Sequence, residues 1–481
     1  MRFQSLSVIL SLVIARVVAY ASNSFQDTCA DLAHHIDLDY PFVVSIAQHY
    51  PPNSGVETAE NITCETYQHT PIEVGFCRFN LKIATTNSSE IYVQVWLPEG
   101  WKGRLLTTGN GGLGGCIGYP TLAYGVSQGF VSIGANGGHN GTSGGAFYNQ
   151  PEVIIDNSRR SDLGKSYYVG CSAGGKVGWK IGQTKPDAFD GNIVGAPAFD
   201  FYRHITYLGL IYTTLWGAVN AAALQQCDGL DGAYDGIIKD PRACKSDESA
   251  VSCNINSTSL CFTDDQIATV KRFFAPITYN DTILHPTGHF HGYETDLFLY
   301  PYIDLVLLWL LEIFRYMVYN DINWDRATFT LEDGYNAVKL DVGGFGENSP
   351  DITAFRERGD TYYASVQDFF EATTAELDEF YRYFRVGGIG HCYGGPAANV
   401  LGQDGANISG LDADDNLITR IVEWAERGEA PEFVRGTKYV DDVIGGEVAF
   451  KRKHCKVPLV NSYKGTKKGT DEDGWECVEK E

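Results

Sequence analysis

Two short segments of the chain, residues 141–145 and 170–174, have the pattern Gly-x-Ser-x-Gly. On a strained turn between a strand and a helix, a serine flanked in this way can attack an ester, because the glycines let the turn close. In a chain with 53 glycines the pattern means little without its context. Residues 166–169 predict a strand before Ser172, and a helix is predicted after it. Ser143 lies in a glycine-rich loop without either element, so Ser172 is the predicted nucleophile.

The proton of the serine needs a general base, and His391 has the most suitable setting among the eleven histidines. In hydrolases with such a turn, the histidine follows the nucleophile in the chain. Residues 384–390 predict a strand and then a flexible loop that ends at His391. Cys171 precedes Ser172, and Cys392 follows His391. A disulfide between these cysteines would hold their Cα atoms about 5 to 6 Å apart. The hydroxyl and the imidazole would then be within reach of each other. A surface histidine without a catalytic role is the alternative.

The glycine-rich segment 109–114 has two interpretations. Its pattern Gly-x-Gly-x-x-Gly occurs in dinucleotide-binding turns, which lead into a helix and are followed about twenty residues later by an acidic residue. Cys116, Gly118 and Pro120 argue against a helix directly after the segment, and the acidic residue is missing. An oxyanion loop fits better, because each backbone N–H beside a tetrahedral intermediate contributes about 3 to 4 kcal/mol. A structural glycine turn is the alternative.

An acidic loop places Asp228, Asp231 and Asp235 within eight residues, separated by glycines. Carboxylates this close repel one another unless a cation lies between them, and hard oxygen ligands suit Ca²⁺. The spacing is not that of an EF-hand. A solvated Asp-Gly turn is the alternative to a calcium site.

The elements that would position these residues alternate between strands and helices. Residues 91–97 alternate apolar and polar side chains, as a strand does. Short apolar runs between glycine clusters over residues 104–133 are typical of buried strands in an α/β sheet. The later stretch is richer in aromatic residues and contains two close cysteine pairs. We predict an α/β-hydrolase fold over residues 22–200 and 345–481, with a lid domain inserted at residues 201–344.

Residues 1–21 have the form of a secretory signal peptide, with a basic start, an apolar centre and a small-x-small cleavage site. The stretch is too short and too interrupted to serve as a membrane anchor, and a buried first helix is the alternative. The mature protein is therefore expected to be secreted and extracellular. A net charge of −23 argues against nucleic acid or an anionic membrane surface as a partner.

Twelve cysteines in an oxidising compartment favour disulfides over metal ligation. No Cys-x-x-Cys occurs in the sequence, which argues against a zinc ribbon. Six Asn-x-Ser/Thr sites are consistent with glycosylation. These sites are Asn61, Asn87, Asn140, Asn256, Asn280 and Asn407.

Several motifs together resemble the fungal tannase and feruloyl esterase family, over most of the mature chain. They are Cys171-Ser172 and residues 109–116, 138–147, 189–198 and 388–396. The resemblance implies a disulfide that links the nucleophile to the base. It implies that Ala173, with Gly111 or Gly112, donates hydrogen bonds to the oxyanion.

The resemblance also implies a structural calcium ion and a set of disulfides. The calcium ligands in the lid would be the side chains of Asp228, Asp231 and Asp235 with the backbone carbonyls of Ala233 and Ile237. The implied disulfides are Cys29–Cys77, Cys64–Cys116, Cys171–Cys392, Cys227–Cys244, Cys253–Cys261 and Cys455–Cys477.

By resemblance, the chain is a serine carboxylic-ester hydrolase. Feruloyl esterase activity, which releases hydroxycinnamic acids from plant cell-wall polysaccharides such as xylan, is the first expectation. The substrate would then be a small aromatic ester or a feruloylated polysaccharide. Tannase activity on galloyl esters is the second.

Two segments of the family pattern are missing from the sequence. One carries the catalytic acid, for which Asp360 is the nearest substitute by position. The other is the helical crossover expected before residue 167, which the sequence reduces to a turn at most. A catalytically impaired or non-catalytic relative is therefore a third hypothesis.

Overall fold

The computed structural model describes most of the chain. The described residues are 24–36, 38, 40–56, 64, 71–159, 167–185, 188–198, 201–210, 216–253, 261–285, 308–346, 372–465 and 469–479. The predicted signal peptide at residues 1–21 and the candidate acid Asp360 lie outside them. Within the described part, no helix is long and apolar enough to cross a membrane.

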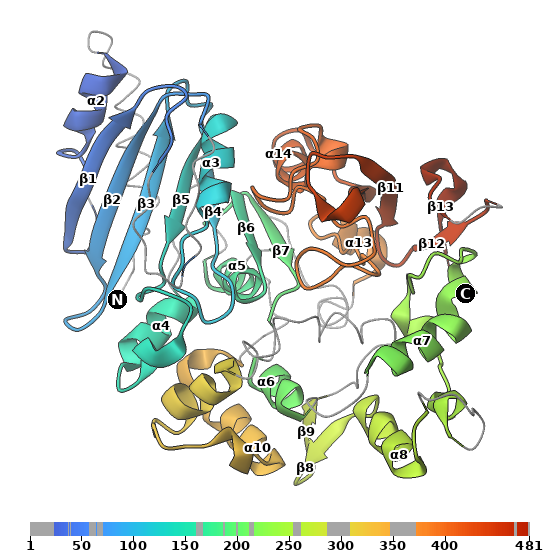
Figure 1. Ribbon diagram of the computed structural model, residues 1–481. Helices are drawn as coiled ribbons and strands as arrows, with labels where there is room; N and C mark the ends of the chain where they lie inside the picture. The colour runs from blue at the N-terminus through green and yellow to red at the C-terminus, as the bar shows by residue number, and fades with distance from the viewer. Residues whose placement is uncertain are drawn as a thin grey trace.

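A mixed seven-stranded sheet forms the central layer of the fold (Figure 1). Its strands, in spatial order, are β1 (Phe42–Tyr50), β2 (Phe76–Ala84), β3 (Glu90–Pro98), β5 (Phe130–Ala135), β4 (Arg104–Thr108), β6 (Tyr167–Cys171) and β7 (Gly191–Gly195). The pairs from β1 to β5 are antiparallel, and those from β5 to β7 are parallel. Such a sheet with helices on both faces is an α/β fold, as the sequence predicts.

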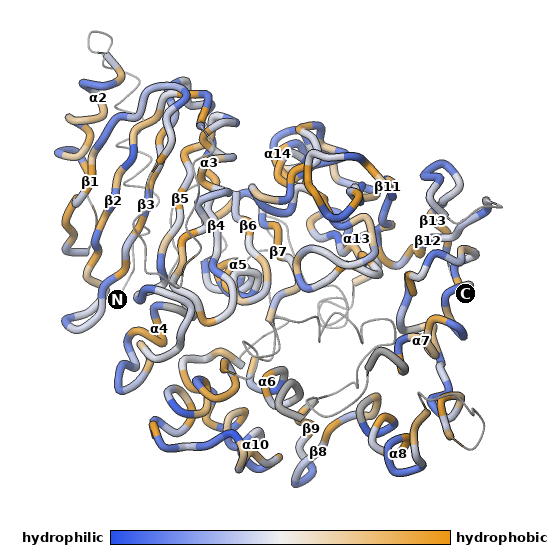
Figure 2. Tube along the Cα trace, in the orientation of Figure 1, coloured by the Kyte–Doolittle hydropathy of each residue, from blue (hydrophilic) through white to orange (hydrophobic). Residues whose placement is uncertain are grey.

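Helices cover both faces of the sheet, because successive side chains along a strand point to opposite sides. α3 (Tyr119–Ser127) and α14 (Leu417–Arg427) pack on the face that carries Leu106 and Tyr167. α2 (Phe25–Leu32) packs on the opposite face, as does α5 (Ala173–Thr184), which covers Tyr168. Figure 2 shows apolar residues along the strands of the sheet and hydrophilic stretches in the outer turns.

Two helices correct the expectations from sequence. α4 (Pro151–Arg159) lies in the connection before β6, where at most a turn was expected. Its Val153 and Ile154 are buried, and this packing stabilises a helix too short to form by itself. α3 begins three residues after Cys116, although no helix was expected directly after the glycine loop. Pro120 is tolerated there because it lies in the first turn of the helix.

The stretch between β7 and residue 346 lies below the sheet in Figure 1 and shares a core with Leu113, Phe147, Val153 and Ile154 of the preceding part of the chain. Its regular elements are α6 (Phe201–Leu210), α7 (Trp216–Cys227), α8 (Asp264–Phe273), β8 (Ile277–Tyr279), β9 (Thr282–His285), the helical residues 308–312, the π-helical turn Ile313–Val318 and α10 (Leu331–Leu340). Ile313 and Phe314 are completely buried in that core.

The C-terminal part returns to the side of β7. It contains α13 (Thr374–Asp378), α14 and two hairpins, β10 (Phe433–Tyr439) with β11 (Val448–Cys455) and β12 (Val460–Tyr463) with β13 (Trp475–Val478). The strand expected at residues 384–386 is wrong, since Phe384 forms only an isolated bridge with Lys456.

Candidate active site

Ser172 lies on a sharp turn between β6 and α5, at the carboxyl end of the parallel strands. Its backbone has φ 59° and ψ −121°, a conformation that costs a non-glycine residue about 1 to 3 kcal/mol. The flanking glycines make the turn possible. A Cβ atom on Gly170 would lie 2.7 Å from the carbonyl carbon of Gly174, and one on Gly174 would lie 2.9 Å from the carbonyl oxygen of Asn110. Side chains at either position would clash with the backbone.

Neighbouring backbone holds this strained turn in place. The N–H of Ser172 donates to the carbonyl of Gly195 (3.0 Å), and the N–H of Ala198 donates to the carbonyl of Ser172 (3.0 Å). Ser172 occupies the N-cap position of α5, where a serine hydroxyl usually accepts a bond from the helix. Here it makes no such bond, nor any other side-chain hydrogen bond to the described residues. The hydroxyl is thus free for chemistry.

Ser143, in the other Gly-x-Ser-x-Gly segment, is fully engaged in structure. Its hydroxyl accepts a bond from the N–H of Gly145 (3.0 Å) and donates to the carboxylate of Glu312 (2.5 Å). Glu312 is 6% exposed and also accepts a bond from the N–H of Gly144 (2.8 Å). Ser143 therefore caps the 3₁₀ helix Gly144–Phe147. Nothing local predicts its bond to Glu312, because 169 positions separate the two residues.

The glycine loop after β4 lies directly beside the turn at Ser172, because β4 and β6 are parallel neighbours. The N–H of Gly109 donates to the carbonyl of Val169 (3.1 Å), which extends this pairing into the loop. The backbone N–H groups of Gly111, Gly112 and Ala173 make no hydrogen bond within the described part of the chain. Ala173 also begins α5, where the helix dipole favours negative charge. These three N–H groups are available for an oxyanion.

The structure also brings Trp309 to this loop. Gly112 has φ 60°, and a Cβ atom there would lie 2.5 Å from the edge of the Trp309 ring. The indole nitrogen of Trp309 is buried without a hydrogen-bond partner in the described structure. Sequence reasoning did not single out this residue, because the contact joins segments about two hundred positions apart.

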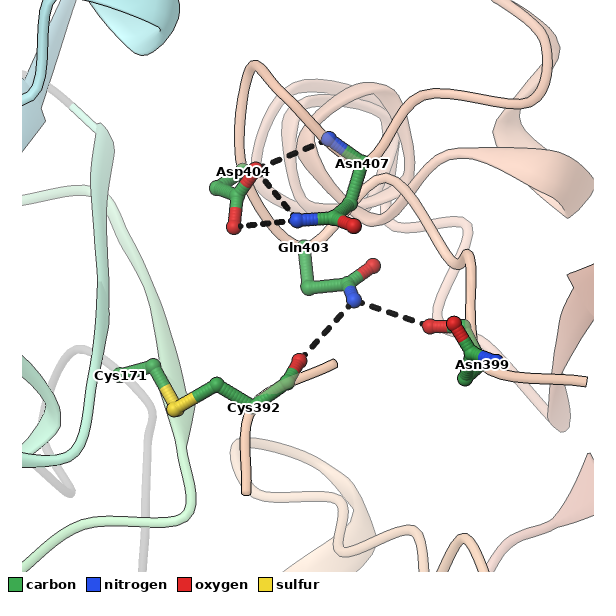
Figure 3. The surroundings of a disulfide bond; sticks show 6 residues. All are labelled: Cys171, Cys392, Asn399, Gln403, Asp404 and Asn407. Carbon is green, nitrogen blue, oxygen red and sulfur yellow. Dashed lines mark hydrogen bonds between the residues drawn. A yellow bond between two sulfur atoms is a disulfide. The ribbon is translucent and has the colours of Figure 1, made fainter. Parts of the chain in front are cut away.

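The Cys171–Cys392 disulfide joins the residue before Ser172 to the residue after His391, and its Cα atoms are 6.0 Å apart (Figure 3). The His391 side chain is exposed, yet the protein around it removes part of its hydration and lowers its pKa from the ordinary value of 6.5. Neither Ser172 nor any carboxylate among the described residues hydrogen-bonds to its ring. Catalytic hydrogen bonds are often long before the substrate binds, so the arrangement is compatible with a nucleophile and its base.

The position of the catalytic acid is open. Among the described residues, β7 is the last strand of the sheet on this side, and no further strand pairs with it. Asp360, the nearest substitute by position, lies outside the described residues. The structure therefore assigns no carboxylate to His391.

The acidic loop folds into a compact turn closed by the Cys227–Cys244 disulfide. The Asp228 carboxylate accepts bonds from the N–H groups of Gly236 and Ile237, and Asp235 pairs with the fully buried Arg452 (2.7 Å). One oxygen of Asp231 is buried without a partner. Burial, and to a lesser degree the charge of Asp235, raise the pKa of Asp231 to about 6.

This loop offers the oxygen ligands that calcium prefers, but its carboxylates do not converge on one point. Within the described residues, no three His, Cys, Asp or Glu side chains converge in the manner of a metal site. Ala233 and Ile237, whose carbonyls are the other expected ligands, are both buried. The unpaired oxygen of Asp231 is the atom that a cation would satisfy.

The structure contains six disulfides, paired as the resemblance implies. They are Cys29–Cys77, Cys64–Cys116, Cys171–Cys392, Cys227–Cys244, Cys253–Cys261 and Cys455–Cys477. No described cysteine is free.

The predicted glycosylation sites differ in exposure. Asn87, Asn140 and Asn280 are exposed, whereas Asn61 and Asn256 lie outside the described residues. Asn407 is 8% exposed, and its amide donates to both carboxylate oxygens of Asp404. The nitrogen that would carry a glycan at Asn407 is therefore already engaged inside the protein, which argues against that site.

Comparison with known proteins agrees with this geometry. The sequence model of the family described as "Tannase and feruloyl esterase" matches residues 77–295. The chain is 36% identical over 529 aligned positions to probable feruloyl esterase B-1 of Aspergillus flavus, an alignment that covers 98% of the chain and 100% of the relative. The alignment is longer than the 481-residue chain, so the relative has segments that the chain lacks.

Solved structures give the same result. The crystal structure of feruloyl esterase B from Aspergillus oryzae superposes with a TM-score of 0.87 at 34% identity, covering 95% of this chain and 100% of that one. Tannin acyl hydrolase from Aspergillus niger shares the fold, with a TM-score of 0.54 at 18% identity and coverage of 92% and 91%. The chain therefore belongs to the tannase and feruloyl esterase family.

Proposed function

We propose that this carboxylic ester hydrolase is a secreted feruloyl esterase in which Ser172 is the nucleophile and His391 its base. The observation that carries the assignment is the strained turn at Ser172, joined by a disulfide to the residue after His391. The relatives named feruloyl esterase B favour this substrate class over galloyl esters. The tannase that shares the fold is only 18% identical. The free hydroxyl and the open N–H groups argue against a non-catalytic role.

The reaction would proceed through an acyl-enzyme. The imidazole of His391 takes the proton of the Ser172 hydroxyl as its oxygen bonds to the ester carbonyl carbon. The N–H of Ala173 and that of Gly111 or Gly112 donate to the oxyanion. When the intermediate collapses, the alcohol leaves with the proton held by His391. Water, deprotonated by His391, then releases the acid and restores Ser172.

The lowered pKa of His391 supports its role as base. Loss of hydration disfavours the charged imidazolium. The ring is therefore neutral at a lower pH than an ordinary histidine, and only the neutral ring can accept the proton of Ser172.

Residues 201–344 would act as a lid over the site. Trp309 touches the glycine loop at Gly112, and Glu312 is bonded to the loop at Ser143. The Trp309 ring beside the glycine loop would suit the aromatic ring of a hydroxycinnamoyl ester, whose other part would be a sugar of a cell-wall polysaccharide. The catalytic domain would then comprise residues 22–200 and 345–481.

A calcium ion in the acidic loop would stabilise the lid and take no part in the reaction. Asp228, Asp231 and Asp235, with the carbonyls of Ala233 and Ile237, would hold it, between the two cysteines of the Cys227–Cys244 disulfide. The unpaired oxygen of Asp231 supports this proposal. The six disulfides and the exposed Asn87, Asn140 and Asn280 support passage through the secretory pathway.

Rates of hydrolysis of methyl ferulate and methyl gallate test the substrate assignment. We expect kcat/KM for methyl ferulate to exceed that for methyl gallate by at least about tenfold, a difference of about 1.4 kcal/mol in transition-state binding. The reverse order would identify a tannase. Turnover of both esters no faster than that of the Ser172→Ala variant would identify a non-catalytic relative.

A further inference from the structure

The turn that carries His391 is held by a part-buried side-chain amide as well as by the disulfide. The Nε2 group of Gln403 donates to the carbonyl of Cys392 (3.1 Å) and to that of Asn399 (2.9 Å), as Figure 3 shows. Its Oε1 atom accepts a bond from the N–H of Leu401 (2.8 Å). A backbone N–H can only donate, so this third bond fixes which end of the amide faces Cys392.

Cys392 needs such support because its backbone is in the left-handed region, with φ 74°. That conformation costs an L-residue about 1 to 2 kcal/mol, so other contacts have to maintain it. The disulfide to Cys171 holds the side chain of Cys392, and Gln403 holds its carbonyl. With both constrained, the adjoining peptide group of His391 has little freedom to rotate.

A second amide tightens the same turn. Asn399 is 3% exposed; its Oδ1 atom accepts a bond from the N–H of Gly394 (3.2 Å), and its Nδ2 donates to the carbonyl of Ala397 (3.0 Å). The N–H of Gly390 donates to the carbonyl of Gly394 (3.0 Å), which closes the loop around His391. Gln403 thus connects Cys392, inside this closed loop, to Asn399, which follows the loop.

Gln403 is itself anchored to the sheet layer. The turn that follows it is closed by a bond from the N–H of Gly402 to the carbonyl of Asn407 (2.8 Å) and by the Asp404–Asn407 pair. The N–H of Gly405 donates to the hydroxyl of Thr121 in α3 (3.1 Å). The His391 loop is therefore connected through Gln403 to a helix that packs on the sheet carrying Ser172.

We propose that Gln403 is a positioning residue that sets the direction of the His391 ring toward Ser172. The inference rests on the proposed catalytic roles of these two residues. The ring is attached to the backbone of residues 391–392, so a rotation of that backbone changes the direction of the ring. A misplacement of about 1 Å between reacting groups can cost on the order of a hundredfold in rate. Gln403 is the side chain whose removal releases that backbone while leaving the disulfide intact.

The variant Gln403→Leu tests the proposal, with Gln226→Leu as its matched control. Gln226 makes the same kind of contacts in the lid, donating to the carbonyls of Ala222 (3.0 Å) and Asp247 (3.3 Å) and accepting from the N–H of Asp247 (2.9 Å). We expect kcat on methyl ferulate to fall at least about tenfold in Gln403→Leu, with KM within about threefold of the parent. Gln226→Leu should lower the melting temperature to a similar extent and keep kcat within about twofold.

A second readout separates positioning from stability. The rate at which an organophosphonate ester phosphonylates Ser172 depends on the base but not on ester recognition, so it should fall together with kcat in Gln403→Leu. The variant Gln403→Glu keeps the acceptor for Leu401 and removes the donors, and it should show the same loss.

A folded Gln403 variant that retains more than a third of the parent's kcat would overturn the proposal. So would an equal loss in Gln226→Leu, or failure of both Gln403 variants to fold. If Ser172→Ala instead retains the parent's turnover, the catalytic assignment itself fails.

Discussion

The two Gly-x-Ser-x-Gly segments have the same pattern and entirely different structures. Ser172 lies at the end of a parallel strand with φ 59°, and its hydroxyl has no partner among the described residues. Ser143 lies in a loop and has φ −92°. Its hydroxyl accepts a hydrogen bond from Gly145 and donates one to Glu312. The comparison shows that the pattern alone does not fix the environment of its serine, which depends on whether the segment follows a strand of the parallel sheet. At residues 141–145 the same sequence pattern forms the cap of a 3₁₀ helix.

Removing the hydroxyl of Ser172 and that of Ser143, one at a time, should give the largest difference in kcat between two variants. Ser172→Ala should lower kcat on methyl ferulate by at least about a thousandfold, because no other group can form the acyl-enzyme. Ser143→Ala should keep kcat within about threefold. It should lose about 1 to 2 kcal/mol of stability, because the cap is lost and Glu312 loses a bond. Ester hydrolysis and thermal melts measure both. Equal losses of activity in the two variants would contradict the assignment of the nucleophile.

The disulfide beside Ser172 has no counterpart at Ser143, and its removal should have the next largest effect. The double variant Cys171→Ala, Cys392→Ala should lose about a hundredfold in kcat at temperatures where it remains folded, because the base is no longer held near the nucleophile. The double variant Cys455→Ala, Cys477→Ala is the control, and it should lower the melting temperature with kcat nearly unchanged. If the first variant retained more than about a third of the parent's kcat, a difference under 1 kcal/mol, the bridge would be only a structural staple.

The glycines two positions after each serine make a matched pair. A Cβ atom on Gly174 would lie 2.9 Å from the backbone oxygen of Asn110, whereas one on Gly145 would meet the Ser143 hydroxyl at 3.3 Å and be otherwise nearly free. Gly174→Ala should therefore displace the oxyanion loop and lower kcat by about tenfold. Gly145→Ala should stay within about twofold. Comparable kcat values for the two variants would show that the loop at Asn110 is not part of the site.

Calcium should have the smallest effect on turnover, since none of its expected ligands is the proposed nucleophile, the base or an oxyanion donor. Chelation should lower the melting temperature and leave kcat of the folded protein nearly unchanged. Burial raises the pKa of Asp231 to about 6. In the presence of a chelator, ionisation of this carboxyl should therefore lower the free energy of unfolding as the pH rises through 6. Asp231→Asn should then be more stable than the parent at pH 7, and the order should reverse when calcium is added. Loss of turnover in parallel with calcium at constant folding would assign the ion a catalytic role.

Much of this site could be predicted from the sequence because its signals are local. The strand, the turn and the helix around Ser172 lie within about twenty residues, and Cys171 and Cys392 directly adjoin the two predicted catalytic residues. The helix α4 could not be predicted, because its stability comes from burying Val153 and Ile154 against distant elements. The expected strand at residues 384–386 failed for the opposite reason, since tertiary contacts override a local β-propensity.

The sequence by itself determined the family, and it predicted the compartment, the nucleophile and the base. Only the tertiary structure decided that Ser143 is a helix cap bonded to Glu312, that Asn407 is buried against Asp404, and that Gln403 holds the carbonyl of Cys392. Turns and strands follow from the steric preferences of neighbouring residues. A hydrogen bond between segments far apart in the chain forms only where packing of the whole fold brings a donor and an acceptor together.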